Sequence, residues 1–376
     1  MRALTRAFWA AIALLAYTHA GYPVVLRLLA RRRPSDPLGS DPSGSDPYVS
    51  LIVAAHDEED VIARKVENAL GLDYPRDRLE VVVASDGSTD RTVERARAAG
   101  ADVVLDLPRA GKIATQNAAV ERSRGKLVAF SDANTFWRPD ALARLAHRFE
   151  DPATGYVCGQ VRFLDAEGSN QEGAYWRYEM MVRELESGLG GVTAGNGAIY
   201  AVRREAYVPL GPSRSHDLSF PFALTKAGWR CVYEPGAAAE EKLVPTLEGE
   251  FERKRRMMRG LWDIVVRDGM VSPRGYPALY GFEIASHRLL RYASPLLHAA
   301  AFAANLGLLG RGRIYRLALA AQLGVLVAAA SADAVPSRLA EICRYYVYVT
   351  ASIAAGLWDR WRQGPPAAWE RSEGTR

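Results

Sequence analysis

The chain has 376 residues, is 49% hydrophobic and carries a formal net charge of +5, with a sequence pI of about 9.1. This length exceeds that of one typical domain. A basic pI is common in nucleic-acid-binding proteins, but the basic residues gather beside apolar stretches and in one short cluster, which argues against a nucleic-acid partner. The three cysteines share no short spacing, so the composition supports neither a disulfide framework nor a zinc site.

Residues 1–33 are predicted to form a membrane-spanning helix with a basic flank. Residues 7–26 are almost wholly apolar, and about twenty apolar residues span a bilayer core. Three arginines follow at 31–33, which predicts that the next part of the chain is cytoplasmic. A cleavable signal peptide is the alternative, because Thr18-His19-Ala20 resembles a small-residue cleavage site. Residues 34–47 are rich in Pro, Ser, Gly and Asp and are expected to be a linker.

The middle of the chain, residues 48–265, is predicted to be one α/β domain. The acidic stretch 56–60 is expected to open a helix, since acidic side chains favour a first helical turn. Strands that alternate with helices predict a mostly parallel sheet with helices on both faces. The other elements expected from apolar runs and amphipathic segments are strands at 48–55, 79–85, 102–105 and 126–130 and helices at 91–98 and 112–122.

Two acidic motifs follow strands of this domain. Ser85–Asp90 (SDGSTD) and Ser131–Asn134 (SDAN) each stand at the carboxyl end of an apolar run. Ligands of open α/β sheets bind beyond the carboxyl ends of the strands, and the oxygens of a D-x-N motif suit a divalent cation. The first strand-to-helix turn lacks glycine, and Gly111-Lys112 is followed by Ile113, so dinucleotide and P-loop fingerprints are absent. A nucleotide held by carboxylates, a metal and basic side chains is therefore predicted.

Six motifs, taken in order, resemble the family 2 inverting glycosyltransferases, which have the GT-A fold. The resemblance covers about residues 48–262 and implies an enzyme that uses a nucleotide-diphosphate sugar, expected to be a UDP-sugar, with Mg²⁺ or Mn²⁺ as cofactor. The segments that carry it are Val49–Glu59, Ser85–Asp90, Gly111-Lys112 with Asn117, Ser131–Asn134, Gly195–Tyr200 with Arg203–Glu205, and His216-Asp217 followed by Ala227–Pro235.

The resemblance implies roles for individual residues on the donor side. Asp217 is expected to be the general base, because inversion needs one carboxylate to take the proton of the acceptor hydroxyl. Asp132 and Asn134 are the candidate metal ligands, although many relatives have a carboxylate where this chain has Asn134. The residues expected to contact the donor nucleotide are Ala55, Glu58, Asp86, Lys112 and Asp132.

Further residues are expected to contact the diphosphate and the acceptor. Arg253 and Arg256 lie three apart and hence on one face of a helix, where two guanidiniums suit a diphosphate. Polysaccharide synthases of the family carry a tryptophan where this chain has Met257, so the resemblance leaves chain extension open. On the acceptor side, Gly197 and Trp176 are the expected contacts.

Several of these residues also have a simpler interpretation. Asp86 before a glycine suits a turn or a helix cap, and Asp217 suits the N-cap of the helix that follows it. Lys112 suits a solvated helix start. The basic run 253–259 suits a membrane surface, and Trp176 suits an anchor at a membrane interface.

The carboxyl-terminal part is predicted to return to the membrane. Residues 266–291 are expected to be an amphipathic interfacial segment, residues 292–360 to contain transmembrane helices, and residues 361–376 to be a polar tail. Helices that lie on the membrane are the alternative, because each apolar stretch is short or interrupted. The stretches are Tyr292–Leu309, Leu317–Ala332 and Ile342–Trp358.

These features together predict a multi-pass enzyme of a bacterial inner membrane with a cytoplasmic catalytic domain. It is expected to transfer a sugar to a glycan or lipid-linked acceptor in exopolysaccharide or cell-envelope synthesis, alone, as a homo-oligomer or with other synthesis proteins. A transferase that adds one sugar to a glycolipid is the alternative within this class. A catalytically silent membrane scaffold that keeps the fold is the alternative from another class.

Overall fold

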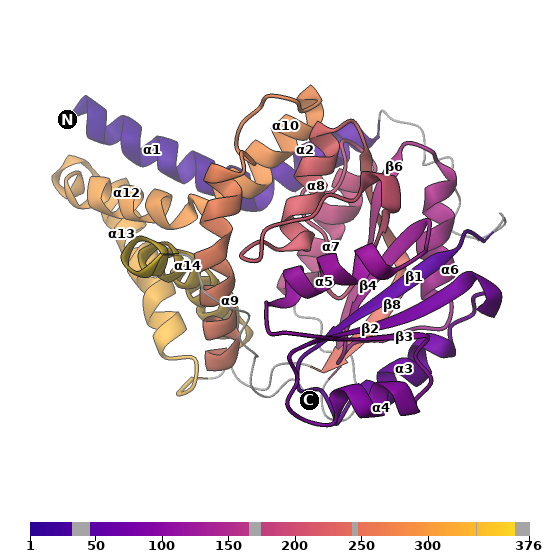
Figure 1. Ribbon diagram of the computed structural model, residues 1–376. Helices are drawn as coiled ribbons and strands as arrows, with labels where there is room; N and C mark the ends of the chain where they lie inside the picture. The colour runs from indigo at the N-terminus through magenta and orange to yellow at the C-terminus, as the bar shows by residue number, and fades with distance from the viewer. Residues whose placement is uncertain (32–45, 165–173, 243–246, 336, 365–376) are drawn as a thin grey trace. The chain divides into compact units, whose positions relative to one another are not determined.

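A computed structural model describes residues 1–31, 46–164, 174–242, 247–335 and 337–364 of the chain (Figure 1). The chain divides into two compact units. The sheet unit contains the described parts of Leu26–Pro245 and Ile264–Gly281, and the helical unit contains those of Met1–Val25, Thr246–Asp263 and Phe282–Pro365. The domain boundaries expected from the sequence remain predictions.

The sheet unit is built on one eight-stranded mixed sheet in the order β3-β2-β1-β4-β7-β6-β8-β5. Its strands are β1 (Val49–Ala55), β2 (Leu79–Asp86), β3 (Val103–Leu107), β4 (Leu127–Asp132), β5 (Phe136–Trp137), β6 (Thr154–Leu164), β7 (Ile199–Arg203) and β8 (Arg230–Lys242). The four strands expected from the sequence form a parallel half, β3-β2-β1-β4. In the other half, β6 and β8 are parallel, whereas β7 is antiparallel to both of its neighbours and β5 is antiparallel to β8.

Helices cover both faces of this sheet, as the sequence predicted. The helices of the unit are α3 (Ile62–Leu70), α4 (Thr92–Ala98), α5 (Lys112–Arg122), α6 (Ala141–His147), α7 (Ala174–Ser187) and α8 (His216–Lys226). Alternate strand residues enter opposite cores: Leu51 packs with residues of α3 and α6, and Ile52 packs with residues of α5 and α8. Because both faces are buried, β1, β2 and β4 are mostly apolar, with Ser50 and Glu80 as buried polar residues near the amino ends of β1 and β2.

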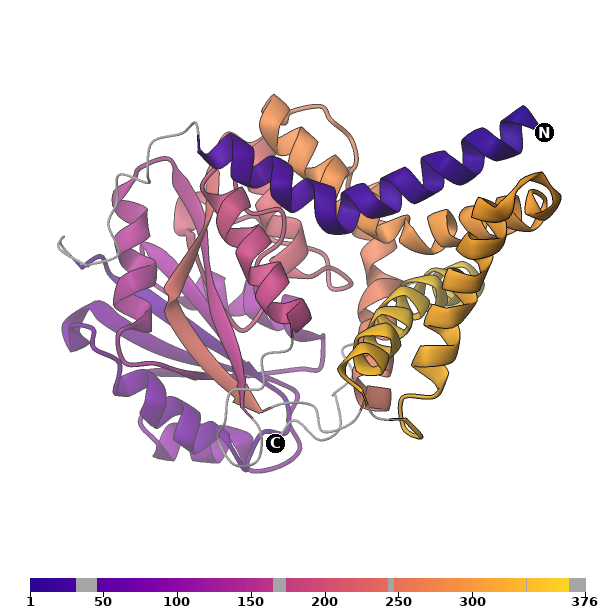
Figure 2. The ribbon, with the colours of Figure 1, turned by 180° about the vertical axis from the view of Figure 1, so that it is seen from behind.

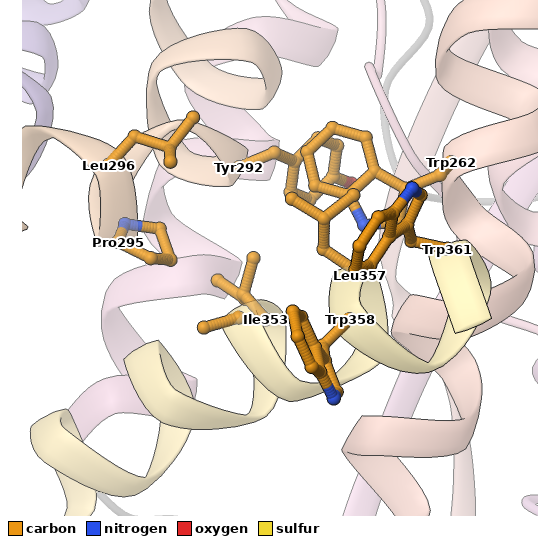
Figure 3. A pocket seen from close by; sticks show the side chains of 9 residues that line it. Trp262, Tyr292, Pro295, Leu296, Ile353, Leu357, Trp358 and Trp361 are labelled. Carbon is orange, nitrogen blue, oxygen red and sulfur yellow. The ribbon is translucent and has the colours of Figure 1, made fainter.

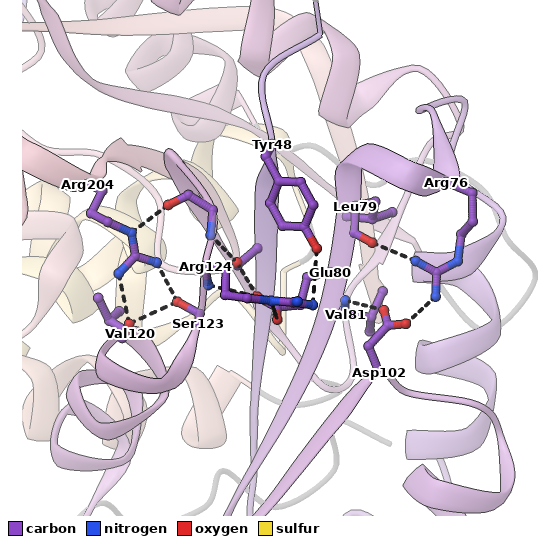
Figure 4. A network of polar contacts seen from close by, with 12 residues as sticks. Tyr48, Arg76, Leu79, Glu80, Val81, Asp102, Val120, Ser123, Arg124 and Arg204 are labelled. Carbon is purple, nitrogen blue, oxygen red and sulfur yellow. Dashed lines mark hydrogen bonds and ion pairs between the residues drawn. The ribbon is translucent and has the colours of Figure 1, made fainter.

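The amino ends of the central strands are fixed by a polar network around Glu80 (Figure 4). Glu80 is 1% exposed and accepts hydrogen bonds from Ser50 Oγ at 2.6 Å and from Arg124 N and Nε, both at 2.9 Å. Arg204 adds hydrogen bonds to Val120 O at 3.0 Å and Ser123 Oγ at 2.7 Å. These bonds stabilise the edge of the sheet where the parallel strands begin. The acidic motifs lie at the opposite edge, at the carboxyl ends of the strands.

The helix expected to carry Ile62 and Val66 is present as α3, but its expected start in the acidic stretch 56–60 is wrong, because α3 begins only at Ile62. The backbone N–H groups of three residues before it donate to side chains of the loop after β2. Asp57 N donates to Ser88 Oγ at 3.0 Å, and Glu58 N donates to Thr92 Oγ1 at 2.7 Å. Glu59 N likewise donates to the side chain of Asp90. These bonds hold the acidic stretch as a loop.

The helical unit contains the amino-terminal helix and most of the carboxyl-terminal helices. Residues Arg2–Ala30 form one continuous helix, seen in indigo in Figure 2, with a π-helical turn at Tyr17–Gly21. Arg255 and Asp359 join two helices of the unit by a two-point ion pair at 2.5 and 2.9 Å. The elements are α1 (Arg2–Ala16), α2 (Tyr22–Ala30), whose last residues belong to the sheet unit, α9 (Leu247–Trp262), α11 (Leu290–Tyr292), α12 (Ser294–Leu306), α13 (Arg313–Ala330) and α14 (Arg338–Gln363). The short helix α10 (Ala278–Glu283) begins in the sheet unit and ends in the helical unit.

Within the described residues, two helices are long and apolar enough to cross a membrane, Arg2–Ala30 and Arg313–Ala330. The sequence leaves the number of carboxyl-terminal spans open, and the prediction of a multi-pass protein is not supported. The helix α12 has 13 residues, which is too short. The helix α14 has 26 residues, but charged side chains near both of its ends leave only residues 345–358 without a charge. The two candidate spans are assigned by helix length and composition alone, and a signal sequence at the amino terminus has the same length and composition.

All three cysteines are free thiols. Cys158 on β6 and Cys231 on β8 are buried between the sheet and its helices. Cys343 lies on α14 of the helical unit and is partly exposed.

Candidate functional site

The acidic motifs meet at one edge of the sheet. In the register of the parallel strands, Ala54 pairs with Asp132 and Ala55 pairs with Ser85, which precedes Asp86. The carboxyl ends of β1, β2 and β4 therefore bring Ala55, Asp86 and Asp132 side by side, as expected for neighbouring parallel strands. Glu58 stands in the loop directly after β1, and its backbone bond to Thr92 ties that loop to the segment after β2.

Asp86 is completely buried and holds the loop before α5. Its Oδ1 accepts hydrogen bonds from Ala110 N at 2.7 Å and Gly111 N at 3.0 Å, and its Oδ2 pairs with Arg109 Nη1 at 3.1 Å. Gly87 adopts φ +63°, and a Cβ there would come within 2.8 Å of Arg109 N. Only glycine permits this close approach of the two loops. These bonds support the turn interpretation of Asp86, and its expected contact with the nucleotide remains a prediction.

Lys112 opens α5 and forms an ion pair with Asp132 through Oδ1 of the carboxylate. Both side chains are partly exposed, at 19% and 29%. Lys112 is therefore a partly exposed residue at the helix start, as the simpler interpretation expects, and it also contacts Asp132, while its donor role remains a prediction. The pair also indicates that a cation is favourable beside Asp132.

The donor atoms near Asp132 suit a divalent cation that takes its other ligands from phosphate and water. Asn134 lies two residues further on, and its Nδ2 is 3.5 Å from Glu241 Oε1. Among the residues that the structure describes, no cluster of three or more His, Cys, Asp or Glu side chains forms a closed metal cage. Mg²⁺ and Mn²⁺ are hard ions that accept one or two protein oxygens plus substrate phosphates. Asp132 with Asn134 fits that mode of binding.

The segment before β7 forms the next wall of the site. Gly195 N donates to Asp217 O at 2.7 Å, so this segment and the start of α8 are joined. A Cβ at Gly195 would lie 1.8 Å from Tyr156 Oη, which requires glycine there. A Cβ at Gly197, in contrast, would meet nothing within 4 Å. Gly197 therefore borders open space, as an acceptor-side position requires.

His216 and Asp217 begin α8. Ser215 is the N-cap residue, so Asp217 is not the cap and instead lies in the first turn. Its carboxylate is partly exposed and accepts no hydrogen bond from the described residues. His216 is buried, and its Nδ1 is 2.6 Å from Tyr200 Oη. Burial, together with the charge of Lys112, lowers the pKa of His216 to about 3, so this residue is neutral at ordinary pH.

Tyr200 links Asp132 to Asp217. It lies on β7 opposite Phe130 of β4, two residues before Asp132, and bonds to His216, one residue before Asp217. Burial raises the pKa of Tyr200 well above its ordinary value, and the negative charges of Asp132 and Asp217 both add to this effect. The candidate metal ligand Asp132 and the candidate base Asp217 therefore both lie within electrostatic reach of the buried Tyr200 side chain.

Three of the expected site residues are not brought to this edge by the described contacts. Arg253 and Arg256 lie on α9 of the helical unit, and the side chain of Arg253 is outside the described residues. Their diphosphate role remains a prediction. Trp176 on α7 packs edge-on against Phe163 and donates its indole N–H to Val161 O at 3.2 Å. These packing contacts account for the position of Trp176, and its expected acceptor-side role remains a prediction.

Three residues at the site were not expected from the sequence. Arg109 pairs with Asp86, and Lys65 and Asn68 of α3 bond to the loop that follows Asp132. Burial lowers the pKa of Lys65 to about 7, with an opposing effect from Asp132. The sequence does contain a signal for Lys65: it stands three residues after Ile62 and four before Ala69, on the apolar face of α3.

A separate apolar pocket of about 450 Å³ lies within the helical unit. Figure 3 shows the rings of Trp262, Tyr292 and Trp361 gathered at one end, with Pro295 and Leu296 facing them. The remaining lining residues come from α14 and are Ile353, Ala354, Leu357 and Trp358. The volume lies within the range of pockets that hold a small molecule or part of a lipid.

Comparison with known proteins identifies the family of the sheet unit. A family profile described as "Glycosyl transferase family 2" matches residues 50–208. The beta-monoglucosyldiacylglycerol synthase of Nostoc sp. is 28% identical over 251 residues, which are 59% of this chain and 52% of that protein. The poly-beta-1,6-N-acetyl-D-glucosamine synthase of Staphylococcus aureus strain MSSA476 is 25% identical over 232 residues, 58% of this chain and 56% of that protein. The chain thus spans about half the length of these curated relatives.

A solved structure shares the fold over nearly the whole chain. It is a mannosyltransferase from Pyrobaculum calidifontis in complex with GDP-Man and Mn²⁺, with a TM-score of 0.74 and 24% sequence identity. The match covers 95% of this chain and 99% of that one. The predicted GT-A fold is confirmed.

Proposed function

Because residues 50–208 form a glycosyltransferase family 2 domain, we propose that the chain is an inverting glycosyltransferase that moves a sugar from a nucleoside-diphosphate donor to an acceptor hydroxyl. One observation carries this proposal. Asp217 has a partly exposed carboxylate in the first turn of α8, its backbone carbonyl is bonded to Gly195, and both Asp217 and Asp132 lie within electrostatic reach of the buried Tyr200. Inversion at an anomeric carbon with a metal-bound diphosphate needs a carboxylate base and a cation site at one active site.

Asp217 is the proposed general base. It accepts the proton of the acceptor hydroxyl as that oxygen attacks the anomeric carbon from the side opposite the leaving diphosphate. His216, the residue before it, is buried and neutral and therefore adds no charge beside Asp217.

The donor side is built from strand ends. Asp86 and Ala55 border the nucleotide, with Glu58 in the next loop, and Asp132 with Asn134 would hold Mg²⁺ or Mn²⁺. A bound divalent cation offsets the charge that develops on the leaving diphosphate. Lys112 contributes a mobile positive charge at the same place, and Arg253 and Arg256 are the proposed further contacts of the diphosphate.

A lipid-linked acceptor is the proposed acceptor class, because the helical unit contains an apolar pocket lined by three tryptophans (Figure 3). The relative from Nostoc is named for a diacylglycerol lipid, which agrees with this assignment. We place the protein at a membrane on the apolar surfaces of Arg2–Ala30 and Arg313–Ala330. The second candidate is a polymerising synthase, as the staphylococcal relative is named.

The first experiment measures release of nucleoside diphosphate by the purified full chain in detergent. Nucleotide sugars with uridine and guanosine are supplied in turn, with Mg²⁺ or Mn²⁺ and with diacylglycerol or a glycan as acceptor. Asp217→Asn keeps the shape of the side chain and is expected to lower turnover by about 10²–10⁴-fold. Asp151→Asn, on the same unit but paired with Arg230, is the control and keeps wild-type turnover. Normal turnover in Asp217→Asn would remove this residue from the mechanism, and no turnover with any donor would favour a catalytically silent scaffold.

A second experiment tests the acceptor class. Ala354→Phe places a ring in the pocket of the helical unit, whereas Ala351→Phe adds the same ring to an exposed position of α14 that does not line it. If a lipid chain occupies the pocket, only the first variant raises the KM for diacylglycerol, and hydrolysis of the donor without acceptor stays unchanged. An equal effect of both variants, or of neither, would contradict this site.

A further inference from the structure

The helix α3 holds the chain that follows the candidate metal motif. Lys65 is fully buried on this helix, and its ammonium group donates to Thr135 O at 2.6 Å. Thr135 comes directly after Asn134, and its own N–H is 3.3 Å from Asp132 O. The turn from Asp132 to Thr135 therefore has one buried side-chain anchor at its end.

A second anchor is two residues further along the chain. The side-chain amide of Asn68 donates from Nδ2 to Trp137 O at 2.9 Å and accepts from Trp137 N at 2.9 Å through Oδ1. This pair of bonds satisfies both polar groups of the Trp137 backbone, as a neighbouring strand would do. On the same helix, the Arg64 guanidinium lies 4.0 Å from the centre of the Phe136 ring. Residues 135–137 are thus each contacted by one residue of α3.

We infer that Lys65 and Asn68 are positioning residues that place Asp132 and Asn134 for the divalent cation. The inference rests on the proposed function. A loop held only by packing would let the oxygens of a two-residue metal site move independently, whereas hydrogen bonds to the backbone fix the segment that carries them. Residues behind metal ligands commonly act in this way.

The choice of a lysine supports this role. A methionine of similar length would fill the same space without the cost of burying an ammonium group. The ammonium group instead satisfies the carbonyl of Thr135 and lies within electrostatic reach of Asp132.

The test uses Lys65→Met and Asn68→Leu in the purified full chain. Binding of Mn²⁺ is followed by the electron paramagnetic resonance signal of the free ion, in the presence of GDP or UDP in separate titrations. Each variant is expected to need about tenfold more Mn²⁺ for half-saturation. Val66→Ala is the control, because it removes buried methyl groups from the same helix and leaves every bond to the loop intact.

Hydrogen exchange provides a readout that does not depend on metal or activity. Peptides that cover residues 132–137 are expected to exchange faster in both variants and at the wild-type rate in Val66→Ala. Asn68→Asp separates the two bonds of this side chain, because a carboxylate accepts from Trp137 N but cannot donate to Trp137 O. It is expected to fall between wild type and Asn68→Leu.

Unchanged Mn²⁺ binding together with unchanged exchange would overturn the inference. So would equal losses in Val66→Ala, since the effect would then be one of general stability. A wild-type protein that consumes no nucleotide sugar would instead contradict the proposed function, and hydrogen exchange would still report whether α3 holds the loop.

Discussion

Lys112 forms an ion pair with Asp132, the residue that is also the candidate metal ligand. A cation and the ammonium group therefore compete for the same carboxylate. A divalent cation held by Asp132 would displace the ammonium group of Lys112, which would then be able to turn to the negatively charged donor. The pair links the arrival of the metal to the repositioning of a basic side chain.

This competition predicts that one substitution strengthens metal binding and at the same time lowers turnover. Lys112→Met is expected to bind Mn²⁺ more tightly, by about fivefold if the partly exposed pair contributes about 1 kcal/mol, while its turnover falls because the diphosphate loses a positive partner. Titration of Mn²⁺ with and without a nucleoside diphosphate measures the first effect. Lys126→Met, at the amino end of β4, is the control. Weaker binding in Lys112→Met would show that the lysine supports the metal site instead of competing for it.

Two glycines of one segment are predicted to respond differently to the same change. Gly195→Ala would place a methyl group 1.8 Å from Tyr156 Oη, and overpacking of this kind costs about 1–3 kcal/mol of unfolding free energy. Gly197→Ala meets no atom within 4 Å and is expected to change stability by less than about 0.5 kcal/mol. Thermal midpoints compare the two variants. Adding Tyr156→Phe should relieve part of the cost in Gly195→Ala, and the absence of any relief would contradict the clash.

His216 is predicted to make the stability of the sheet unit depend on pH. Its pKa in the folded protein is about 3, against an ordinary value of 6.5. As the pH falls below about 6.5, His216 binds a proton in the unfolded chain but not in the folded chain. The free energy of unfolding therefore decreases until the pH reaches about 3. Between pH 7 and pH 5 this amounts to about 2 kcal/mol.

His216→Phe removes this proton but leaves Tyr200 Oη without its bond, so the variant is less stable at pH 7, by about 1–3 kcal/mol. Its deficit relative to wild type is expected to shrink as the pH falls to 5. Urea midpoints at the two pH values measure the difference. A deficit that stays constant would mean that His216 is not kept neutral by its surroundings.

The Arg255–Asp359 ion pair is predicted to stabilise the helical unit. The pair has two short bonds and a largely buried carboxylate, so a coupling of about 1 kcal/mol is expected from a double-mutant cycle with Arg255→Gln and Asp359→Asn. The Arg344–Asp333 pair, with a carboxylate 82% exposed, is expected to show no measurable coupling. Equal coupling in the two cycles would contradict this assignment.

The parallel half of the sheet could be predicted from the sequence because its strands are mostly apolar runs and its helices lie between them. The expected helix at 112–122 has the same bounds as α5. The strand expected at 102–105 begins one residue later, because the Asp102 carboxylate accepts from Val81 N at 2.8 Å and pairs with Arg76. That shift depends on a residue far away in the chain, which local patterns do not contain.

The same limit explains which site residues were missed. Asp86, Asp132 and Asp217 belong to short motifs and could be proposed from them. Lys65 and Asn68 could not, because they bond to a segment about seventy residues further along the chain. Hydrophobic patterns also overestimated the membrane segments, since α12 ends after 13 residues and α14 carries charged side chains near both of its ends.

The three thiols differ sharply in reactivity. Burial raises the pKa of Cys158 to about 11 and that of Cys231 to about 12, so neither forms the thiolate that reacts with maleimides. Cys343 is the partly exposed one. The natural sequence therefore offers a single labelling position, on α14, for a fluorescent or spin probe. Such a probe would report on the surroundings of this helix in vesicles without any engineered cysteine.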